Sequence, residues 1–262
     1  MKKPSKKNYP SIVKKLLPFF IKAGKKSIEL SGKKLKIFTK SDQTPVSNGD
    51  LAVDKILQDA IRSITPDIEI VSEETIGTNK VGSRTTFWLI DPIDGTKEYI
   101  AGKNEYTLNA ALIIDKVPSI GLVGAPKKRQ LFYSYGLGES YIIENDKKVK
   151  NNCAKKTPKD EVIALSSASH PSEEIMSVLK KHNVTSVVKM SSSYKFCAIA
   201  NGEFDIYAAK ERAHEWDYAA GHAVAEHAGA IIKTLDGESY DYGKENYKNH
   251  SILMRRARNL ND

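Results

Sequence analysis

The sequence predicts an α+β fold with two halves, an N-terminal half built on a mainly antiparallel sheet and a C-terminal half that alternates strands and helices. Four strand patterns follow one another between residues 107 and 144 with only short turns between them, which is typical of an antiparallel meander. Behind a polar stretch at residues 145–159, strand and helix patterns alternate, and such alternation implies parallel strands with crossover helices. We therefore expect one unit at residues 1–150 and another at 151–262.

Apolar residues at helical spacing predict a first helix over residues 9–30, with Gly32 placed to end it. A polar, turn-rich segment at 40–50 leads into a second helix pattern at 51–61. Asp50 stands at the start of that helix, where an aspartate taken alone is most simply an N-cap. An alternating strand follows at 67–71 and ends in two acids, Glu73 and Glu74.

The apolar run at residues 87–90 is typical of a buried strand, and it ends in two aspartates, Asp91 and Asp94. On a straight strand their odd spacing would place them on opposite faces, but a bend at Pro92 can turn both toward one point. Carboxylates are hard oxygen ligands for cations. Gly95 and Thr96 can then begin a helix, whose free N–H groups attract phosphate. Alone, this pattern also suits a nucleotide binder or a calcium site.

The remaining elements follow from the same patterns. Strands are expected at 107–114, 118–125, 130–135, 140–144, 162–166, 186–190 and 204–208, and helices at 172–182, 193–202 and 216–229. The last helix is rich in small residues, which would let another element or a ligand come close. Asp217 lies in its first turn, where an acid can simply serve the helix dipole or can act with the acids upstream.

The net charge of +9 is concentrated at the start of the chain, because residues 1–40 hold 13 lysines and a single acid. The remainder has 28 basic and 31 acidic residues, so the body carries no nucleic-acid signature. A solvated lysine face is the simplest interpretation, with contact to RNA or anionic lipid as the alternative.

The longest apolar run near the start is short, contains Pro18 and lacks a cleavage pattern, and the two cysteines have no metal-type spacing. We expect a cytoplasmic protein, with peripheral membrane association as the alternative.

Two motifs, residues 91–96 (DPIDGT) and 216–221 (WDYAAG), resemble those of the inositol monophosphatase-like superfamily of magnesium-dependent, lithium-sensitive phosphatases. The resemblance extends from residue 41 to residue 230. Segments 72–74, 94–99 and 192–197 look most like CysQ-type 3′(2′),5′-bisphosphate nucleotidases, which convert adenosine 3′,5′-bisphosphate to AMP in sulfur metabolism. The resemblance implies a layered αβαβα sandwich with the site between the halves, and inhibition by lithium.

The resemblance also implies residue roles. Metal ligands would be the carboxylates of Glu73, Asp91, Asp94 and Asp217 and the carbonyl of Ile93, holding about two or three Mg²⁺ ions. The N–H groups of Gly95 and Thr96 would hold the scissile phosphate close to Asp217. Thr96, paired with Asp50, would take a proton from the attacking water, which Glu73 helps to hold, and Glu74 would support these groups from behind.

For the substrate itself, the resemblance implies contacts from Ser192 and Lys195, with His170 flanking the base. Bacterial nucleotidases commonly have an arginine where this chain has Ala209, whereas here Lys210 and Arg212 lie close behind. An inositol or other sugar monophosphatase is the alternative activity, and a non-catalytic phosphate- or RNA-binding protein is a less favoured one. The expected partner is a small phosphate ester rather than nucleic acid, bound by a monomer or homodimer.

Overall fold

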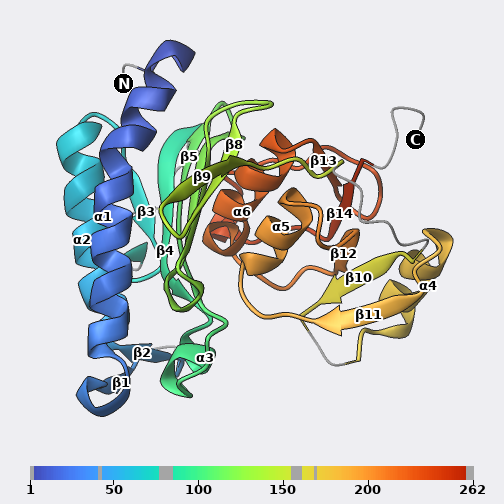
Figure 1. The fold of residues 1–262 in the computed structure, drawn as a ribbon, viewed down its shortest axis with the longest axis horizontal. Coiled ribbons are helices and arrows are strands. Elements are labelled where there is room, and N and C mark those ends of the chain that lie inside the picture. Colours follow the sequence, from blue (N-terminus) through green and yellow to red (C-terminus); the bar gives the residue numbers. More distant parts are fainter. Residues whose placement is uncertain (1–2, 41–42, 77–84, 155–160, 168–169, 258–262) are drawn as a thin grey trace.

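The computed structural model describes residues 3–40, 43–76, 85–154, 161–167 and 170–257, which form five stacked layers (Figure 1). Two helices, α1 (Tyr9–Leu30) and α2 (Asn48–Ile64), make the first layer. They cover a seven-stranded sheet of order β3-β4-β5-β6-β7-β8-β9. Its strands are β3 (Ile70–Ser72), β4 (Thr86–Asp94), β5 (Thr107–Ile114), β6 (Val117–Ala125), β7 (Gln130–Ser134), β8 (Ser140–Glu144) and β9 (Lys147–Lys150).

The other face of this sheet packs on α5 (Tyr194–Ala200) and α6 (Glu215–His227). Beyond them lies a five-stranded sheet of order β11-β10-β12-β14-β13, and α4 (Glu173–Lys181) forms the outermost layer (Figure 1). The strands of this second sheet are β10 (Ile163–Ser166), β11 (Ser186–Lys189), β12 (Ile206–Ala209), β13 (Ala230–Lys233) and β14 (Ile252–Arg256). The predicted combination of an antiparallel and an alternating half is therefore confirmed. The division near residue 150 stays a prediction, and one hydrophobic core joins residues from both halves.

Strand β4 is buried on both faces, which explains its unbroken apolar run. Trp88 and Ile90 face the helix pair α1 and α2, while Phe87 and Leu89 belong to the core beneath α5 and α6. It pairs parallel with β3 and antiparallel with β5. Asp91 and Asp94 therefore lie at the end of a strand that is held in place on both faces.

Small residues allow α6 to lie very close to the first sheet. A Cβ atom at Gly121 of β6 would stand 2.4 Å from the carbonyl oxygen of Ala220, and one at Gly221 would stand 2.7 Å from the side chain of Phe196 in α5. Such contacts exclude any larger side chain at these glycines. The first turn of α6, which carries Asp217, is thereby fixed against β4–β6.

Several local expectations were wrong, each for a physical reason. Strand β9 lies in the segment predicted as a polar linker, because an exposed edge strand rich in lysine has no apolar signal. The turn-rich segment before α2 contains a small hairpin of β1 (Ile37–Thr39) and β2 (Pro45–Ser47). The second sheet is mixed rather than parallel, since β14 runs antiparallel to both β12 and β13.

The start of α2 also differs from the prediction. Ser47 is the N-cap, and its hydroxyl oxygen accepts from the N–H of Gly49 at 3.1 Å. Asp50 is the third residue of the helix, and its carboxylate accepts from the N–H of Ser47 at 2.8 Å, completing a capping box. Asp50 therefore supports the cap without being the cap.

Helix α1 leaves Ile21 and Ile28 exposed on one flank, beside Lys25, and Phe19 exposed on the opposite flank. Within the described parts of the chain, the structure contains no helix that is both long and apolar enough to cross a bilayer.

Candidate metal and phosphate site

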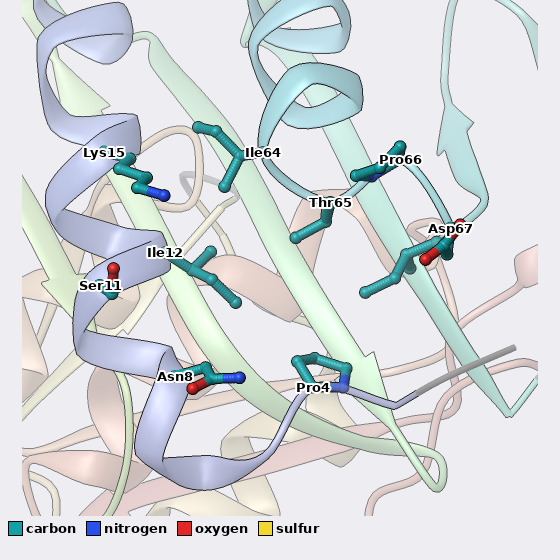
Figure 2. Close-up of a pocket in the computed structure, with 10 residues that line it drawn as sticks. Pro4, Asn8, Ser11, Ile12, Lys15, Ile64, Thr65, Pro66 and Asp67 are labelled. Atoms are coloured by element: carbon teal, nitrogen blue, oxygen red, sulfur yellow. The ribbon is translucent and has the colours of Figure 1, made fainter.

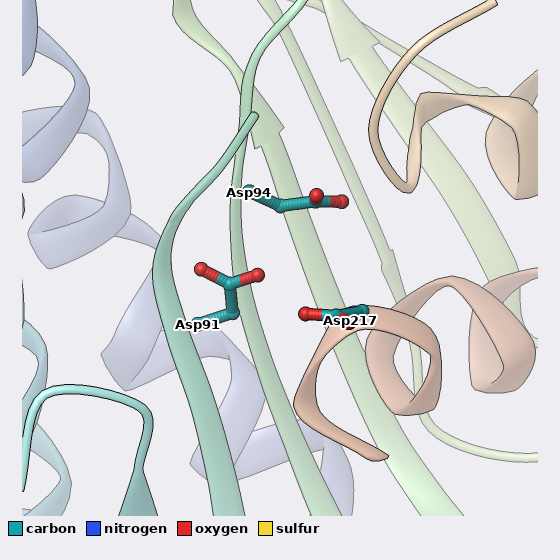
Figure 3. A group of neighbouring side chains, drawn as sticks. All are labelled: Asp91, Asp94 and Asp217. Carbon is teal, nitrogen blue, oxygen red and sulfur yellow. The ribbon is translucent and has the colours of Figure 1, made fainter. Parts of the chain in front are cut away.

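Three aspartates meet where β4 ends against α6. Asp91 and Asp94 come from β4, and Asp217 comes from the first turn of α6, with all three carboxylates directed toward a common point (Figure 3). One oxygen from each lies within 4.8 Å of the others, close enough to hold a metal ion. A register shift between Asp91 and Asp94 against β5 is the predicted bend, and it brings the two carboxylates to one side of the strand.

The three carboxylates suit a hard cation. Burial raises the pKa of Asp91 well above its usual range, and the charges of Glu73, Asp94 and Asp217 add to this effect. Burial also raises the pKa of Asp94 to about 6 and that of Asp217 to about 8. One oxygen of Asp91, Oδ1, is buried and has no hydrogen-bond partner among the described residues. Three carboxylates that repel one another, one of them with an oxygen that lacks a donor among the described residues, fit a divalent cation such as Mg²⁺.

Glu73 lies beside this triad and is paired with a residue that sequence analysis missed. The Lys40 ammonium lies 2.9 Å from a carboxylate oxygen of Glu73 and 2.9 Å from one of Glu74. Glu73 still adds its charge to the repulsion felt by all three aspartates. Burial raises the pKa of Glu74 to about 7. Nothing in the polar segment around Lys40 marks it, because its importance depends on the fold of the β1–β2 hairpin.

The predicted pair of Asp50 and Thr96 is in contact. The Thr96 hydroxyl lies 3.2 Å from Oδ1 of Asp50 and 3.1 Å from the carbonyl oxygen of Ile93. Asp50 is 1% exposed, and burial raises its pKa. Gly95 adopts a left-handed conformation at φ 92°, where a Cβ would approach the carbonyl oxygen of Glu105 at 3.2 Å. Thr96 begins a short helix, α3 (Thr96–Ile100), so a helix starts where the sequence predicts one.

A cavity of about 270 Å³ opens directly beside the triad. Its lining includes Asp94, Asp217 and the two predicted substrate residues, Ser192 and Lys195. It also includes Arg212, which the prediction mentioned only as a neighbour of Ala209. Lys195 is 4% exposed, and its ammonium donates to the carbonyl oxygen of Ser192. The cavity is thus lined by both basic and acidic side chains, namely Lys97, Lys195 and Arg212 with Asp94, Glu98 and Asp217.

His170 lies apart from the acids. It is exposed and lines an adjoining cavity of about 160 Å³ together with Tyr207 and Ala209. Ser167 and Arg212 line both cavities, so the two are neighbours. The structure therefore brings His170 near the outer end of the site and not near the carboxylates.

Another buried carboxylate, Asp54, was also missed. It follows Asp50 by one helical turn of α2, so both lie on the same face. The Ser72 hydroxyl donates to Asp54 at 2.6 Å, and Ser72 directly precedes Glu73. Spacing of four residues on a predicted helix was the signal that could have revealed it. Helix α2 thus supports Thr96 through one acid and the Glu73 turn through the other.

A separate cavity of about 390 Å³ lies between the start of α1 and the turn after α2 (Figure 2). Asn8 and Lys15 line one side and Thr65 and Asp67 the other. It contains none of the predicted site residues, so we assign it no part in the chemistry.

The repulsion among the carboxylates predicts how metal-free protein responds to pH. Asp91 and Asp217 keep protons in the folded state that they lose in the unfolded chain, so the folded state binds more protons. The free energy of unfolding should therefore fall as pH rises from 6.5 to 8.5, by up to about 1.4 kcal/mol per pH unit for each proton. Burial lowers the pKa of His227 to about 4 from its ordinary 6.5. This shift makes the free energy of unfolding rise with pH, but only below pH 6.5.

Urea unfolding in EDTA across this pH range measures the effect. Saturating Mg²⁺ should raise stability most at pH 8.5, where the carboxylates are most fully ionised. Stability that stayed constant or rose with pH in EDTA would contradict the assigned pKa shifts.

The whole chain was compared with known proteins. Residues 14–260 match the model of the inositol monophosphatase family. The 3′(2′),5′-bisphosphate nucleotidase CysQ of Escherichia coli is 35% identical over 211 residues, covering 80% of this chain and 84% of that protein. The crystal structure of CysQ from Bacteroides thetaiotaomicron, described as a bacterial member of the inositol monophosphatase family, superposes with a TM-score of 0.75 at 26% identity, covering 96% and 98% of the chains. Inositol monophosphatase from Anabaena shares the fold at 19% identity, with a TM-score of 0.72 and coverage of 96% and 92%.

Proposed function

The chain belongs to the inositol monophosphatase family, and on that basis we propose that it is a Mg²⁺-dependent 3′(2′),5′-bisphosphate nucleotidase that removes the 3′-phosphate of adenosine 3′,5′-bisphosphate. The predicted family and layered sandwich fold are confirmed. The observation that carries the substrate proposal is the set of three basic side chains, Lys97, Lys195 and Arg212, that line the cavity beside the acidic triad. A bisphosphate presents a second anion that these side chains can neutralise, whereas a sugar monophosphate does not.

For the metal, we propose that Glu73, Asp91, Asp94 and Asp217, with the carbonyl of Ile93, hold about two or three Mg²⁺ ions. The unpartnered, buried oxygen of Asp91 supports this assignment. Bound Mg²⁺ supplies Lewis acidity for the phosphate oxygens and lowers the pKa of a bound water.

The protein groups then act around the phosphate. The N–H groups of Gly95 and Thr96 bind its oxygens at the start of α3. The Thr96 hydroxyl donates toward Asp50, so its oxygen is free to accept a proton from the attacking water. Asp50, whose pKa is raised by burial, is the group suited to receive that proton in turn. Water displaces the ribose oxygen in line, without a covalent enzyme intermediate, and Glu74 supports Glu73 through their shared partner Lys40.

On the substrate side, we propose that Ser192 and Lys195 contact the non-scissile phosphate and that Arg212 replaces the arginine missing at position 209. His170, in the adjoining cavity with Tyr207, is placed to flank the adenine base. Ala209 lines the adjoining cavity, but its methyl side chain has no donor for a phosphate.

Activity on adenosine 3′,5′-bisphosphate compared with inositol 1-phosphate tests the proposal. Arg212→Ala should raise the KM for the bisphosphate by roughly 10- to 100-fold, the effect of losing one charge-assisted hydrogen bond. The kcat/KM for inositol 1-phosphate should stay within about twofold of the parent, because a monophosphate has no second anion. Lys55→Ala is the control, since Lys55 pairs with Asp59 on the exposed side of α2 and lines neither of the two cavities.

Equal or reversed preference for inositol 1-phosphate in the parent protein would exclude the nucleotidase and favour the sugar monophosphatase. Absence of any Mg²⁺-dependent turnover would favour a non-catalytic binder.

Peripheral contact of α1 with an anionic membrane remains a prediction, as does the choice between monomer and homodimer. The exposed Ile21 and Ile28, on the same flank of α1 as Lys25, support the membrane contact. Cosedimentation with vesicles of anionic and of neutral lipid tests it, and equal retention on both would contradict it.

A further inference from the structure

The hydroxyl of Ser193 bonds to residues of strand β5 instead of capping its own helix, α5. Ser193 is the N-cap of α5, where a serine side chain usually accepts from the N–H groups of its own helix. Here it makes no such bond. Its hydroxyl donates instead to Oδ1 of Asn109 at 2.7 Å. The Ser193 oxygen lies 2.8 Å from that of Thr107, whose hydroxyl therefore donates to it.

These partners lie directly opposite the metal acids. In the β4–β5 pairing, Asn109 is the register partner of Asp91 and Thr107 that of Asp94. The backbone N–H of Ser193 donates to Asp94 itself. Asn109 is 0% exposed, and its side chain lies close enough to Asp94 to help lower the pKa of that carboxyl. Ser193 therefore contacts both the acid and the strand that supports it.

The residue before Ser193, Ser192, lines the substrate cavity. Ser192 is held at φ 57°, a left-handed conformation that costs energy for a residue other than glycine. Its carbonyl oxygen accepts from the Lys195 ammonium, and its hydroxyl oxygen accepts from the N–H of Tyr194 at 3.3 Å. The conformation that presents Ser192 and Lys195 to the cavity is thus fixed at one end by the bonds of Ser193.

We propose that the Ser193 hydroxyl is a positioning group that couples the metal acids to the substrate-binding start of α5. Docked on Thr107 and Asn109, it holds the backbone N–H of Ser193 against Asp94, so that ordering of Asp94 by a cation also orders Ser192 and Lys195. Removal of the hydroxyl leaves every metal ligand and every substrate-contacting group in the chain. Metal and substrate should then bind more independently.

Hydrogen exchange of the full-length protein, with and without Mg²⁺, tests this coupling. In the parent, Mg²⁺ should slow exchange at residues 191–197 by about tenfold or more, while α4, on the outer layer, should not respond. Ser193→Ala should retain Mg²⁺ binding by calorimetry but lose most of this protection. Thr107→Val, which removes the donor to Ser193 with nearly unchanged volume, should have the same effect, and Thr107→Ser, which keeps the hydroxyl, should restore it.

Steady-state kinetics give the second measurement. Ser193→Ala should raise KM for the bisphosphate by about tenfold with a smaller change in kcat, and Thr107→Val should add little to it in the double variant because both act through one bond. Unchanged Mg²⁺ protection in both Ser193→Ala and Thr107→Val, or full additivity of their effects, would overturn the proposal. If Ser193→Ala does not fold, Thr107→Val alone decides by the same criterion.

This inference rests on the proposed metal-dependent function, but the exchange measurement uses Mg²⁺ alone and does not depend on which ester is hydrolysed. Failure of Mg²⁺ to bind the parent would refute the proposed metal site together with the coupling. Normal Mg²⁺ binding without protection at residues 191–197 would refute the coupling alone.

Discussion

Asp94→Asn should abolish Mg²⁺-dependent turnover, lowering kcat by at least about 1,000-fold, which corresponds to roughly 4 kcal/mol of lost transition-state stabilisation. The amide oxygen of asparagine can still accept from the backbone N–H of Ser193, so the local structure should persist. What is lost is the negative charge facing Asp91 and Asp217, and with it the affinity for a divalent cation. Phosphate release at saturating Mg²⁺ measures the effect.

The free energy of unfolding gives a second test of Asp94→Asn, because it should not fall although kcat does. Asp94 is one of three buried carboxylates that repel one another, so Asp94→Asn should leave the metal-free protein at least as stable as the parent at pH 8. Asp59→Asn is the matched control, because Asp59 is exposed and pairs with Lys55 on the surface of α2. Substantial turnover in Asp94→Asn would refute the metal assignment, and a large loss of stability would show that the carboxylate is structural.

The parts of the site that could be predicted from sequence are those carried by short, continuous motifs. Residues 91–96 form a buried strand, a bend and a helix start in one stretch, so local chemistry alone indicates oxygen ligands beside free N–H groups. Asp217 belongs to a second such motif at the start of α6. Only the family resemblance predicted that these two motifs lie together. The spacing of apolar residues identifies a helix or a strand, but it does not say which helix end contacts which strand end.

The parts that could not be predicted depend on contacts across long stretches of chain. Lys40 reaches Glu73 across 33 positions, and Ser193 reaches Thr107 across 86. Serines and lysines are common on surfaces, so neither type stands out in a sequence until the fold buries it or pairs it. Edge strand β9 was missed for a related reason, since the exposure of its side chains removes the apolar alternation that identifies a strand.

Thr96→Val is the second change with a large expected effect, and it separates the proton path from metal binding. Loss of the hydroxyl should lower kcat by roughly 100- to 1,000-fold, the range for one general acid–base group, while calorimetric Mg²⁺ affinity stays near that of the parent. Asp50→Asn should have a similar effect, since an amide placed at 3.2 Å from the Thr96 oxygen can donate to it but cannot receive its proton.

The effects of Thr96→Val and Asp50→Asn on kcat should not be additive, because both groups act on one proton. The double variant, Thr96→Val with Asp50→Asn, should be within a few-fold of the worse single variant. Asp50 also supports the cap of α2, and Asn48→Ala is the control for the start of that helix, because the Asn48 side chain bonds to the backbone of Lys34 and Lys36. It should cost about 1 kcal/mol of unfolding free energy with kcat retained. If Asn48→Ala lowered kcat as much as Asp50→Asn, the effect of Asp50 would be structural. If the two active-site changes multiplied, Thr96 and Asp50 would act separately and the proton would leave by another route.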